Sequence, residues 1–266
     1  MPSYQPVTAV LRGFDVLAAV STLKRAAVGD IHKLTGLNRP TVVRMLETLE
    51  HAGFVFRHAD APLYSVTGKT LELSEGYDPG GQLGAASQPW LMALQRRIGW
   101  PSDVGVRDGD AMMVAATSRG EGRLFFNRRP GYRAPMLATS LGRAWLAFAD
   151  ARERERCLAL LRDAPETWNE PARNVSQCTR LLAKVRRQGY ATIHPDYAER
   201  EYRGAVSTLG VPILVDGRVA GALNAMFLRD TLAPAEAVEK LLGPLQETAA
   251  QIAAALGGGS LDRAGR

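Results

Sequence analysis

The sequence predicts an α+β protein built in two parts, and two patterns support this prediction. Near the N-terminus, three short amphipathic segments precede two short strand-like runs around a turn. After a stretch rich in glycine, helical segments alternate with antiparallel hairpins, which favours a sheet covered by helices on one face. A chain of 266 residues has room for two domains.

The best-defined element of the first part is a helix expected to begin near Arg39. Asn38 can cap it by accepting a hydrogen bond from an N–H group of the first turn, and Pro40 is tolerated there because its missing donor would be unpaired anyway. Four apolar residues recur at i, i+3, i+4 and i+7, so one face would be buried: Val42, Met45, Leu46 and Leu49.

The opposite face of this helix carries short polar and guanidinium groups. Its members, with those at the N-terminal tip, are Asn38, Arg39, Pro40, Thr41, Arg44 and Thr48. Groups of this kind reach base edges and phosphates in DNA complexes, although a helix face that only meets solvent has the same composition. The neighbouring elements therefore decide between the two interpretations.

The neighbouring elements favour DNA binding. Two further helices and two short strands are expected, over 10–20 and 28–35 and over 54–57 and 63–66. Three short helices followed by a hairpin are typical of a winged helix-turn-helix domain, whose last helix enters the major groove while the wing lies along the backbone. Residues 1–67 form this domain in the prediction, with Arg57 and His58 in the wing.

Charge alone does not establish a nucleic-acid partner. The net charge is +6, which would suit DNA. However, residues 1–67 hold seven Lys and Arg against five Asp and Glu, a balance of only +2, and most of the excess lies further along the chain. The prediction of DNA binding therefore depends on where the few cations lie and not on their number.

Membrane, metal and disulfide signals are missing from the sequence. No apolar run approaches the roughly 20 residues of a membrane span, and the N-terminus lacks a basic segment ahead of a hydrophobic core, so we expect a cytoplasmic protein. Cys157 and Cys178 have no CxxC pattern, and the four histidines show no ligand spacing. These patterns predict buried, reduced thiols and no metal or other cofactor.

A connecting segment over 68–84 is expected to join the two parts. Lys69–Tyr77 can form a short helix with Leu71 and Leu73 for packing, and one proline and three glycines then break it over 78–84. Such a segment can join a DNA-reading head to a dimerising or sensing domain, or it can be an inert spacer.

The larger part, over 85–257, combines helices with strands. Helices are expected over 85–98, on both sides of Asp150, over 175–188 and over 234–256, and strands over 102–108, 111–117, 123–129, 190–193, 205–216 and 218–228. Asp216-Gly217 between two apolar runs is the clearest local signal, because this pair favours a two-residue hairpin turn. Residues 258–266 are expected to form a disordered tail.

The whole chain from about Val10 to Leu256 resembles the IclR family of bacterial transcription regulators. Four runs carry the resemblance, in family order: "GLNRPTVVRMLETLEHAGFV", "PMLATSLGRAWLAF", "RRQGYA" and "STLGVPILVDGRVAGALNAMF". Two further runs, "LSEGY" and "WPSDVGVRDGDAMMV", are similar to the branch that includes the activator of hydroxyphenylpropionate catabolism. That branch implies an aromatic acid, or a related breakdown product, as the effector.

The resemblance implies a GAF/PAS-like effector-binding domain, with a pocket where the start of a "GKA"-like helix meets the late hairpin. The matching positions are Thr139, Ser140, Leu141, Thr208, Asn224 and Met226. Free N–H groups and the helix dipole at such a helix start suit a carboxylate. Met226 stands where smaller polar residues are frequent, which favours a more apolar cavity and an aromatic ring. Packing in the core is the alternative role for each of these residues.

The chain departs from the family pattern in two places. Arg143 replaces the usual lysine, and the acidic residue that often follows the "GYA" strand start is missing near Ile193 and His194. We expect 194–204 to be a long loop with an exposed His194. A basic segment could draw anions to the pocket or simply be solvated: Arg128, Arg129 and Arg133.

The resemblance also implies a mechanism. A homodimer or homotetramer would place its recognition helices in successive major grooves of a palindromic double-stranded operator, with Thr41 and Arg44 reading bases and Arg39 contacting phosphate or base. An acid bound at the pocket would alter the linker and so the spacing of the heads, provided that it favours one arrangement. Activation and repression both fit, with RNA polymerase as a further candidate partner.

Two other functions remain open on the sequence. An enzyme would need a nucleophile, a base and an orienting group, for which Ser140, His194 and Asp103 are available, but no spacing or GxSxG elbow supports catalysis, so we expect no enzymatic activity. The second alternative is a DNA-binding protein that has no effector, in which the second part of the chain binds no ligand. A stabilising shift with a small acid separates these cases.

Overall fold

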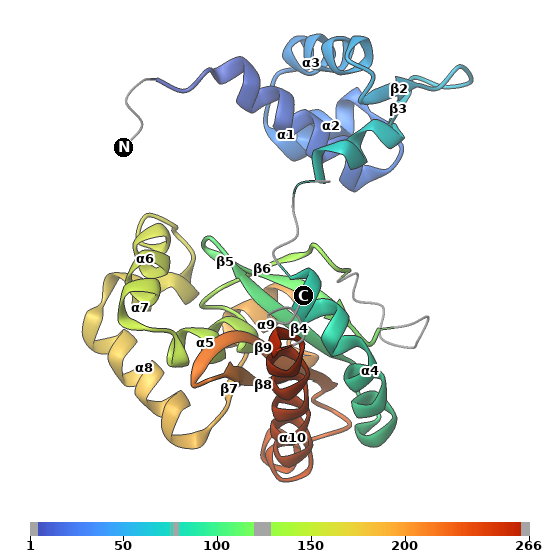
Figure 1. Cartoon of the computed structure of the whole chain (residues 1–266). Helices are drawn as coiled ribbons and strands as arrows, with labels where there is room; N and C mark the ends of the chain where they lie inside the picture. The colour runs from blue at the N-terminus through green and yellow to red at the C-terminus, as the bar shows by residue number, and fades with distance from the viewer. Residues whose placement is uncertain (1–4, 75, 77–79, 120–128, 262–266) are drawn as a thin grey trace. The chain divides into compact units, whose positions relative to one another are not determined.

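A computed structural model of the chain describes residues 5–74, 76, 80–119 and 129–261. The chain divides into two units, Met1–Asp78 and Pro79–Arg266 (Figure 1). Each unit has its own hydrophobic core. The strand expected over 123–129, and with it Arg128, lies outside the described residues except for Arg129.

The N-terminal unit consists of three helices and a small antiparallel sheet. Its elements are α1 (Thr8–Leu23), α2 (Val28–Thr35), α3 (Arg39–His51), β1 (Ala26–Ala27), β2 (Val55–Arg57) and β3 (Leu63–Val66), with strand order β1-β3-β2. Val42 and Leu46 of α3 are fully buried, and Met45 and Leu49 pack against the same core. The predicted helices and hairpin are therefore confirmed.

The turn between α2 and α3 shows why the chain reverses there. Gly36 takes a φ of 70°, which glycine adopts readily, and its N–H donates to the carbonyl oxygen of His32 to end α2. Asn38 then caps α3, because its Oδ1 accepts a hydrogen bond of 2.9 Å from the N–H of Thr41. The two-residue strand β1 was not predicted, since two alanines carry no alternating pattern.

The segment after the hairpin is less packed than expected. Gly68–Ser74 forms a 3-10 helix, η1. Leu71 and Leu73, expected to pack, are 71% and 58% exposed. A 3-10 turn gathers every third residue on one face, so the pair two positions apart does not share a buried side.

The first helix of the second unit, α4 (Gly81–Ile98), begins earlier than predicted. The expected break over 78–84 therefore does not reach Gly84, which is buried in the first turn of α4. A Cβ atom at Gly84 would lie 2.9 Å from the carbonyl oxygen of Ala115. This glycine lets the helix approach the sheet closely and is not a hinge residue.

Within the described residues, a six-stranded antiparallel sheet forms the centre of the C-terminal unit, in the order β6-β5-β4-β9-β8-β7. The strands are β4 (Ser102–Asp108), β5 (Ala111–Thr117), β6 (Arg133–Pro135), β7 (Ala191–Thr192), β8 (Val206–Val215) and β9 (Arg218–Leu228). Asp216 and Gly217 join β8 to β9 with φ angles of 49° and 75°, the positive values that a type I′ hairpin turn requires.

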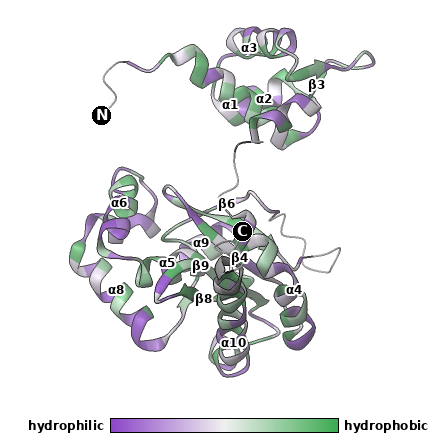
Figure 2. Ribbon diagram, in the orientation of Figure 1, coloured by the Kyte–Doolittle hydropathy of each residue, from purple (hydrophilic) through white to green (hydrophobic). Residues whose placement is uncertain are grey.

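Helices cover both faces of this sheet, so the prediction of one covered face was wrong. Leu209 and Val211 of β8 lie in a core with α4 and α10 (Pro234–Leu261), whereas Gly210 between them faces α5 (Ser140–Phe148). The reason lies in the sequences of β8 and β9, which are buried over most of their length and do not alternate with polar residues. The covering helices mix hydrophobic and hydrophilic residues along their length, as amphipathic helices do (Figure 2).

The remaining helices complete the unit. They are α6 (Ala151–Leu161), η2 (Thr167–Asn169), α7 (Glu170–Arg173), α8 (Val175–Gln188) and α9 (Pro195–Tyr202). Three of them, α6, α7 and α8, lie together on one side of the unit (Figure 1). Asp150 caps α6 through the N–H of Glu153 at 2.8 Å, and Gly189 ends α8 with a φ of 78°.

Two predicted irregular segments are helical. The segment 194–204 forms α9 and its C-cap, because Tyr197, Ala198 and Tyr202 supply an apolar face at helical spacing. At the C-terminus, α10 extends beyond the predicted helix end at Leu256, to Leu261. Each added residue gains a backbone hydrogen bond there. None of the described helices combines the length and apolarity needed to cross a membrane.

Candidate functional site

The outer face of α3 presents cations to solvent. Arg39, Arg44 and Thr48 are exposed, while Thr41 is half-buried. Among the described residues, neither Arg39 nor Arg44 forms an ion pair, so their guanidinium donors are available to a ligand. Thr48 donates its hydroxyl to the carbonyl oxygen of Arg44 at 2.8 Å and keeps its oxygen as an acceptor.

The wing carries one exposed cation and one partly engaged histidine. Arg57 is exposed at the end of β2. His58 is half-buried, and its Nε2 shares a hydrogen bond of 2.9 Å with the hydroxyl of Ser65, which in turn donates to the carbonyl oxygen of Lys24 at 2.5 Å. Arg57 is thus the freer of the two groups, because the ring of His58 bonds to Ser65, the residue that ties the wing to the end of α1.

The six residues expected at the effector pocket come together beneath α5. Each is at most 3% exposed: Thr139, Ser140, Leu141, Thr208, Asn224 and Met226. Thr208 lies opposite Met226 in the β8–β9 ladder, and its hydroxyl donates to the hydroxyl of Ser140 at 2.7 Å. The packing is tight, since a Cβ atom at Gly210 would lie 2.7 Å from the backbone carbonyl group of Ser140. In this arrangement the hydroxyl groups bond to one another.

Thr139 holds the start of α5 in place. Its hydroxyl accepts a hydrogen bond of 3.2 Å from the N–H of Gly142 and donates one of 3.1 Å to the carbonyl oxygen of Pro135. A side chain at Gly142 would meet the carbonyl oxygen of Met136 at 2.0 Å, so only glycine fits there. These contacts seat the helix start directly over the sheet.

A buried ion pair next to Asn224 was not predicted as part of this site. Asp103 on β4 is fully buried, and its carboxylate accepts hydrogen bonds of 3.1 and 2.7 Å from Nε and Nη2 of Arg119 and one of 2.8 Å from the hydroxyl of Thr117. The N–H of Asp103 donates to Oδ1 of Asn224 at 2.9 Å. The Nη2 of Arg119 also lies 3.4 Å from Sδ of Met226. The signal in the sequence that could have indicated this ion pair is Asp103 itself, an acidic residue within a predicted strand.

Aromatic residues cluster beside Met226. Trp168, Tyr197 and Tyr202 pack with it, and the rings of Trp168 and Tyr197 meet edge to face at 5.2 Å. The hydroxyl groups of Tyr132 and Tyr197 lie 3.5 Å apart. This cluster was not predicted, because the sequence over 194–204 was expected to form a loop.

Arg143 and His194 take structural roles next to this cluster. Arg143 donates to the carbonyl oxygens of Leu137 at 2.7 Å and Thr192 at 3.2 Å, and burial lowers its pKa to about 10, so it stays charged at neutral pH. His194 is the half-buried N-cap of α9, not an exposed loop residue, and its Nδ1 accepts from the N–H of Asp196 at 3.1 Å. Burial first, and then the charge of Arg143, lower the pKa of His194.

The three residues that an enzyme could have recruited do not meet. Ser140 is bonded to Thr208, Asp103 to Arg119, and His194 to the backbone of α9. Without a base in contact with the serine hydroxyl, this arrangement does not activate a nucleophile.

Fold and sites together define a DNA-binding regulator with a ligand-binding domain, and family comparisons agree. The model of the IclR helix-turn-helix domain matches residues 9–58, and that of the bacterial transcriptional regulator IclR C-terminal domain matches residues 81–254. The chain therefore belongs to the IclR family of transcriptional regulators.

Characterised relatives and solved structures span nearly the whole chain. The HTH-type transcriptional regulator XynR of Escherichia coli is 28% identical over 260 residues, 97% of this chain and 99% of XynR. An IclR family transcriptional regulator from Brucella abortus has a TM-score of 0.64 at 25% identity and covers 94% of this chain and 93% of its own. An IclR homolog from Microbacterium hydrocarbonoxydans, complexed with 4-hydroxybenzoate, has a TM-score of 0.65 at 24% identity over 93% and 98%.

Proposed function

We propose that the protein is a homodimeric regulator that binds a palindromic operator through α3 and responds to an aromatic acid bound beneath α5. One observation supports the binding of an effector. Polar side chains gather on the sheet face under α5, where Thr208 bonds to Ser140 and Arg119 pairs with Asp103. They lie beside the aromatic cluster of Trp168, Tyr197 and Tyr202. Polar groups of that kind on a closed apolar face suit a ligand with one ring and one charged end.

On the DNA side, α3 enters the major groove. Arg44 and Thr41 read base edges, Arg39 contacts phosphate or base, and Arg57 of the wing contacts the backbone. Exposure of the three arginines and the lack of ion pairs at them, among the described residues, support these roles. Asn38 keeps its amide N–H groups as donors, because only its oxygen is used in the cap.

A second copy of the chain covers an apolar stripe that runs from the N-cap residue of α1 along its first turns. Val7, Val10, Leu11 and Phe14 recur at i, i+3, i+4 and i+7 and are between 53% and 62% exposed. Such a stripe on a short helix is costly to leave in water, and two copies that pack it together would set the spacing of two α3 helices on one operator. Side-by-side pairing of α1 helices therefore suits half-sites on one face of the DNA.

The acid binds where its carboxylate meets the start of α5 and the Arg119 guanidinium, and its ring packs on Met226 and the aromatic cluster. The 4-hydroxybenzoate in the Microbacterium homologue supports an aromatic acid as the ligand class. The hydroxyl groups of Ser140 and Thr208 exchange their mutual bond for bonds to the ligand. Binding of the acid then favours one arrangement of the dimer. The segment over 68–84 transmits this change to the N-terminal DNA-binding units.

Fluorescence anisotropy tests this proposal. The purified chain is titrated into DNA from upstream of its own and neighbouring genes, at two salt concentrations, with and without a panel of aromatic acids. Specific binding should weaken with salt and respond to one acid. Ser140→Trp, which places an indole against Thr208, should lose the response and keep DNA affinity. Binding without any response would refute the effector part, and the lack of specific binding would refute the DNA part.

A further inference from the structure

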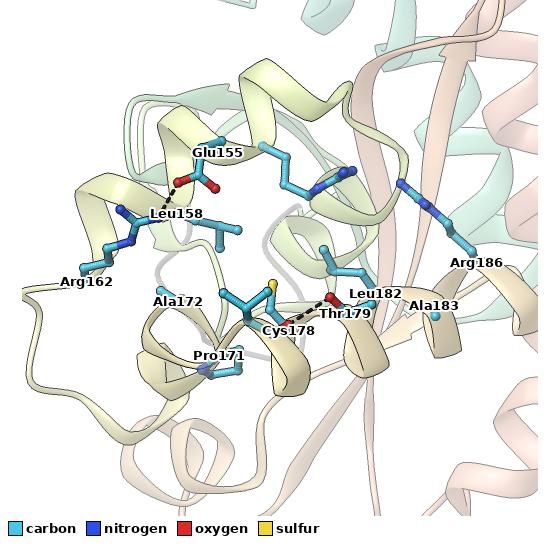
Figure 3. Close-up of a pocket in the computed structure, with 12 residues that line it drawn as sticks. Glu155, Leu158, Arg162, Pro171, Ala172, Cys178, Thr179, Leu182, Ala183 and Arg186 are labelled. Atoms are coloured by element: carbon cyan, nitrogen blue, oxygen red, sulfur yellow. Dashed lines mark hydrogen bonds and ion pairs between the residues drawn. The ribbon is translucent and has the colours of Figure 1, made fainter.

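A cavity lies between α6 and α8 and shares no residue with the site beneath α5. Its volume is about 290 Å³. Figure 3 shows Arg186 at one end and the Glu155–Arg162 ion pair at the other, with Leu158 and Cys178 between them. The cavity is therefore apolar in the middle and charged at its ends.

One end of the cavity carries positive charge that no described carboxylate neutralises. Arg154 donates through Nη1 to the carbonyl oxygen of Ala149 at 3.0 Å, and Arg186 donates through Nε to that of Ala147. Neither guanidinium forms an ion pair within the described residues, in contrast to Arg162. A guanidinium has five N–H donors, and these contacts use one of each. Both groups are thus held in place with donors to spare.

The floor of the cavity is apolar. Leu158, Ala172, Cys178 and Leu182 are each between 5% and 8% exposed and belong to one hydrophobic core. Burial raises the pKa of the Cys178 thiol, so the sulfur is neutral and acts as a small apolar group. The floor can therefore pack against a ring or a short alkyl chain.

We propose that this cavity binds a small carboxylate with an apolar body, with the carboxylate on Arg154 and Arg186 and the body over Leu158, Ala172 and Leu182. Planar guanidinium groups match carboxylate geometry. The volume is at the lower limit of ligand pockets, about 300–1,000 Å³, so the ligand is a single ring or a short chain. This site is additional to the effector site of the proposed function and does not depend on it.

Calorimetry with the full chain tests the charge requirement. Benzoate and its uncharged isostere benzamide are the probes, and benzoate should bind at least about tenfold more tightly, since one charge-assisted contact is worth that much. Arg154→Gln combined with Arg186→Gln keeps N–H donors for the two carbonyl groups and removes both charges, so one benzoate site should be lost. Arg180→Gln, an exposed position on α8 outside the cavity, is the matched control and should change nothing.

Crystals grown with 4-bromobenzoate locate the ligand. A bromine anomalous peak between α6 and α8 in the wild type, absent from the double variant, supports the proposal. A peak only beneath α5 overturns it and supports the effector site instead. Equal binding of benzoate and benzamide, or unchanged stoichiometry in a double variant that unfolds at the wild-type temperature, also overturns it.

Discussion

Removal of the Asp103 carboxylate should destabilise the C-terminal unit far more than removal of a surface charge. Asp103 is fully buried and Arg119 is 7% exposed, and the carboxylate accepts three hydrogen bonds, two from Arg119 and one from Thr117. Asp103→Asn removes the charge and turns one acceptor into a donor that faces Arg119. Breaking a buried ion pair from one side costs about 3–5 kcal/mol.

The size of the effect can be converted into a melting temperature. For a unit of this size, each kcal/mol shifts Tm by about 2–4 °C, so Asp103→Asn should lower Tm by roughly 6–20 °C. Circular dichroism at neutral pH measures this. Glu247→Gln breaks the exposed pair with Arg97, in which the side chains are 55% and 59% exposed, and should leave Tm unchanged.

A double variant separates the buried charge from the loss of packing. Asp103→Asn with Arg119→Met removes both charges, and it should recover part of the lost stability because the buried guanidinium that faced the Asp103 carboxylate is then removed as well. If Asp103→Asn melts within 2 °C of Glu247→Gln, on the order of the shift from a surface pair, the argument for a buried, structurally important ion pair is refuted.

Three further predictions follow from the described contacts. Arg44→Ala should weaken specific DNA binding by about 1–3 kcal/mol and relax base preference at one position, measured by anisotropy with single-base operator variants; unchanged affinity and preference would remove Arg44 from the recognition set. Phe14→Glu should shift the protein toward monomer in sedimentation experiments, because it places charge in the apolar stripe of α1, and an unchanged dimer would locate the interface elsewhere. Since the pKa of His194 is lowered in the folded state, stability from this residue is present above the unfolded pKa of about 6.5 and is lost as pH falls through the folded value. His194→Asn keeps a capping side chain and should reduce the loss of stability between pH 7 and 5, whereas an identical pH profile would contradict this role.

Local signals predicted the parts of the fold that depend on local chemistry. Asn38 capped α3 as expected because the capping bond joins residues three apart, and Asp216-Gly217 formed its turn because positive φ is a property of two residues. The coverage of both sheet faces was missed because the partner of a strand face is set by distant segments. Strand β8 is buried by α5 and α10, which begin at Ser140 and Pro234.

The candidate effector site likewise contains residues that could be predicted from the sequence and residues that could not. The six predicted residues meet beneath α5, because family motifs carry information on residues distant in sequence. Asp103 and Arg119 lie 16 residues apart on different segments, and nothing in their spacing announces an ion pair. The aromatic cluster was missed for a local reason. The segment that supplies Tyr197 and Tyr202 is rich in charge and was expected to be a loop, although its apolar residues follow helical spacing.

The two edges of the described sheet limit how copies of the chain can associate. Strand β7 has only two residues and β6 only three, one of them Pro135 and another Arg133. Short edges with proline and charge offer few free N–H and C=O groups to a strand from another molecule, which is how natural sheets avoid polymerisation. Within the described residues, contacts between copies through side-chain surfaces therefore fit these edges better than strand pairing does.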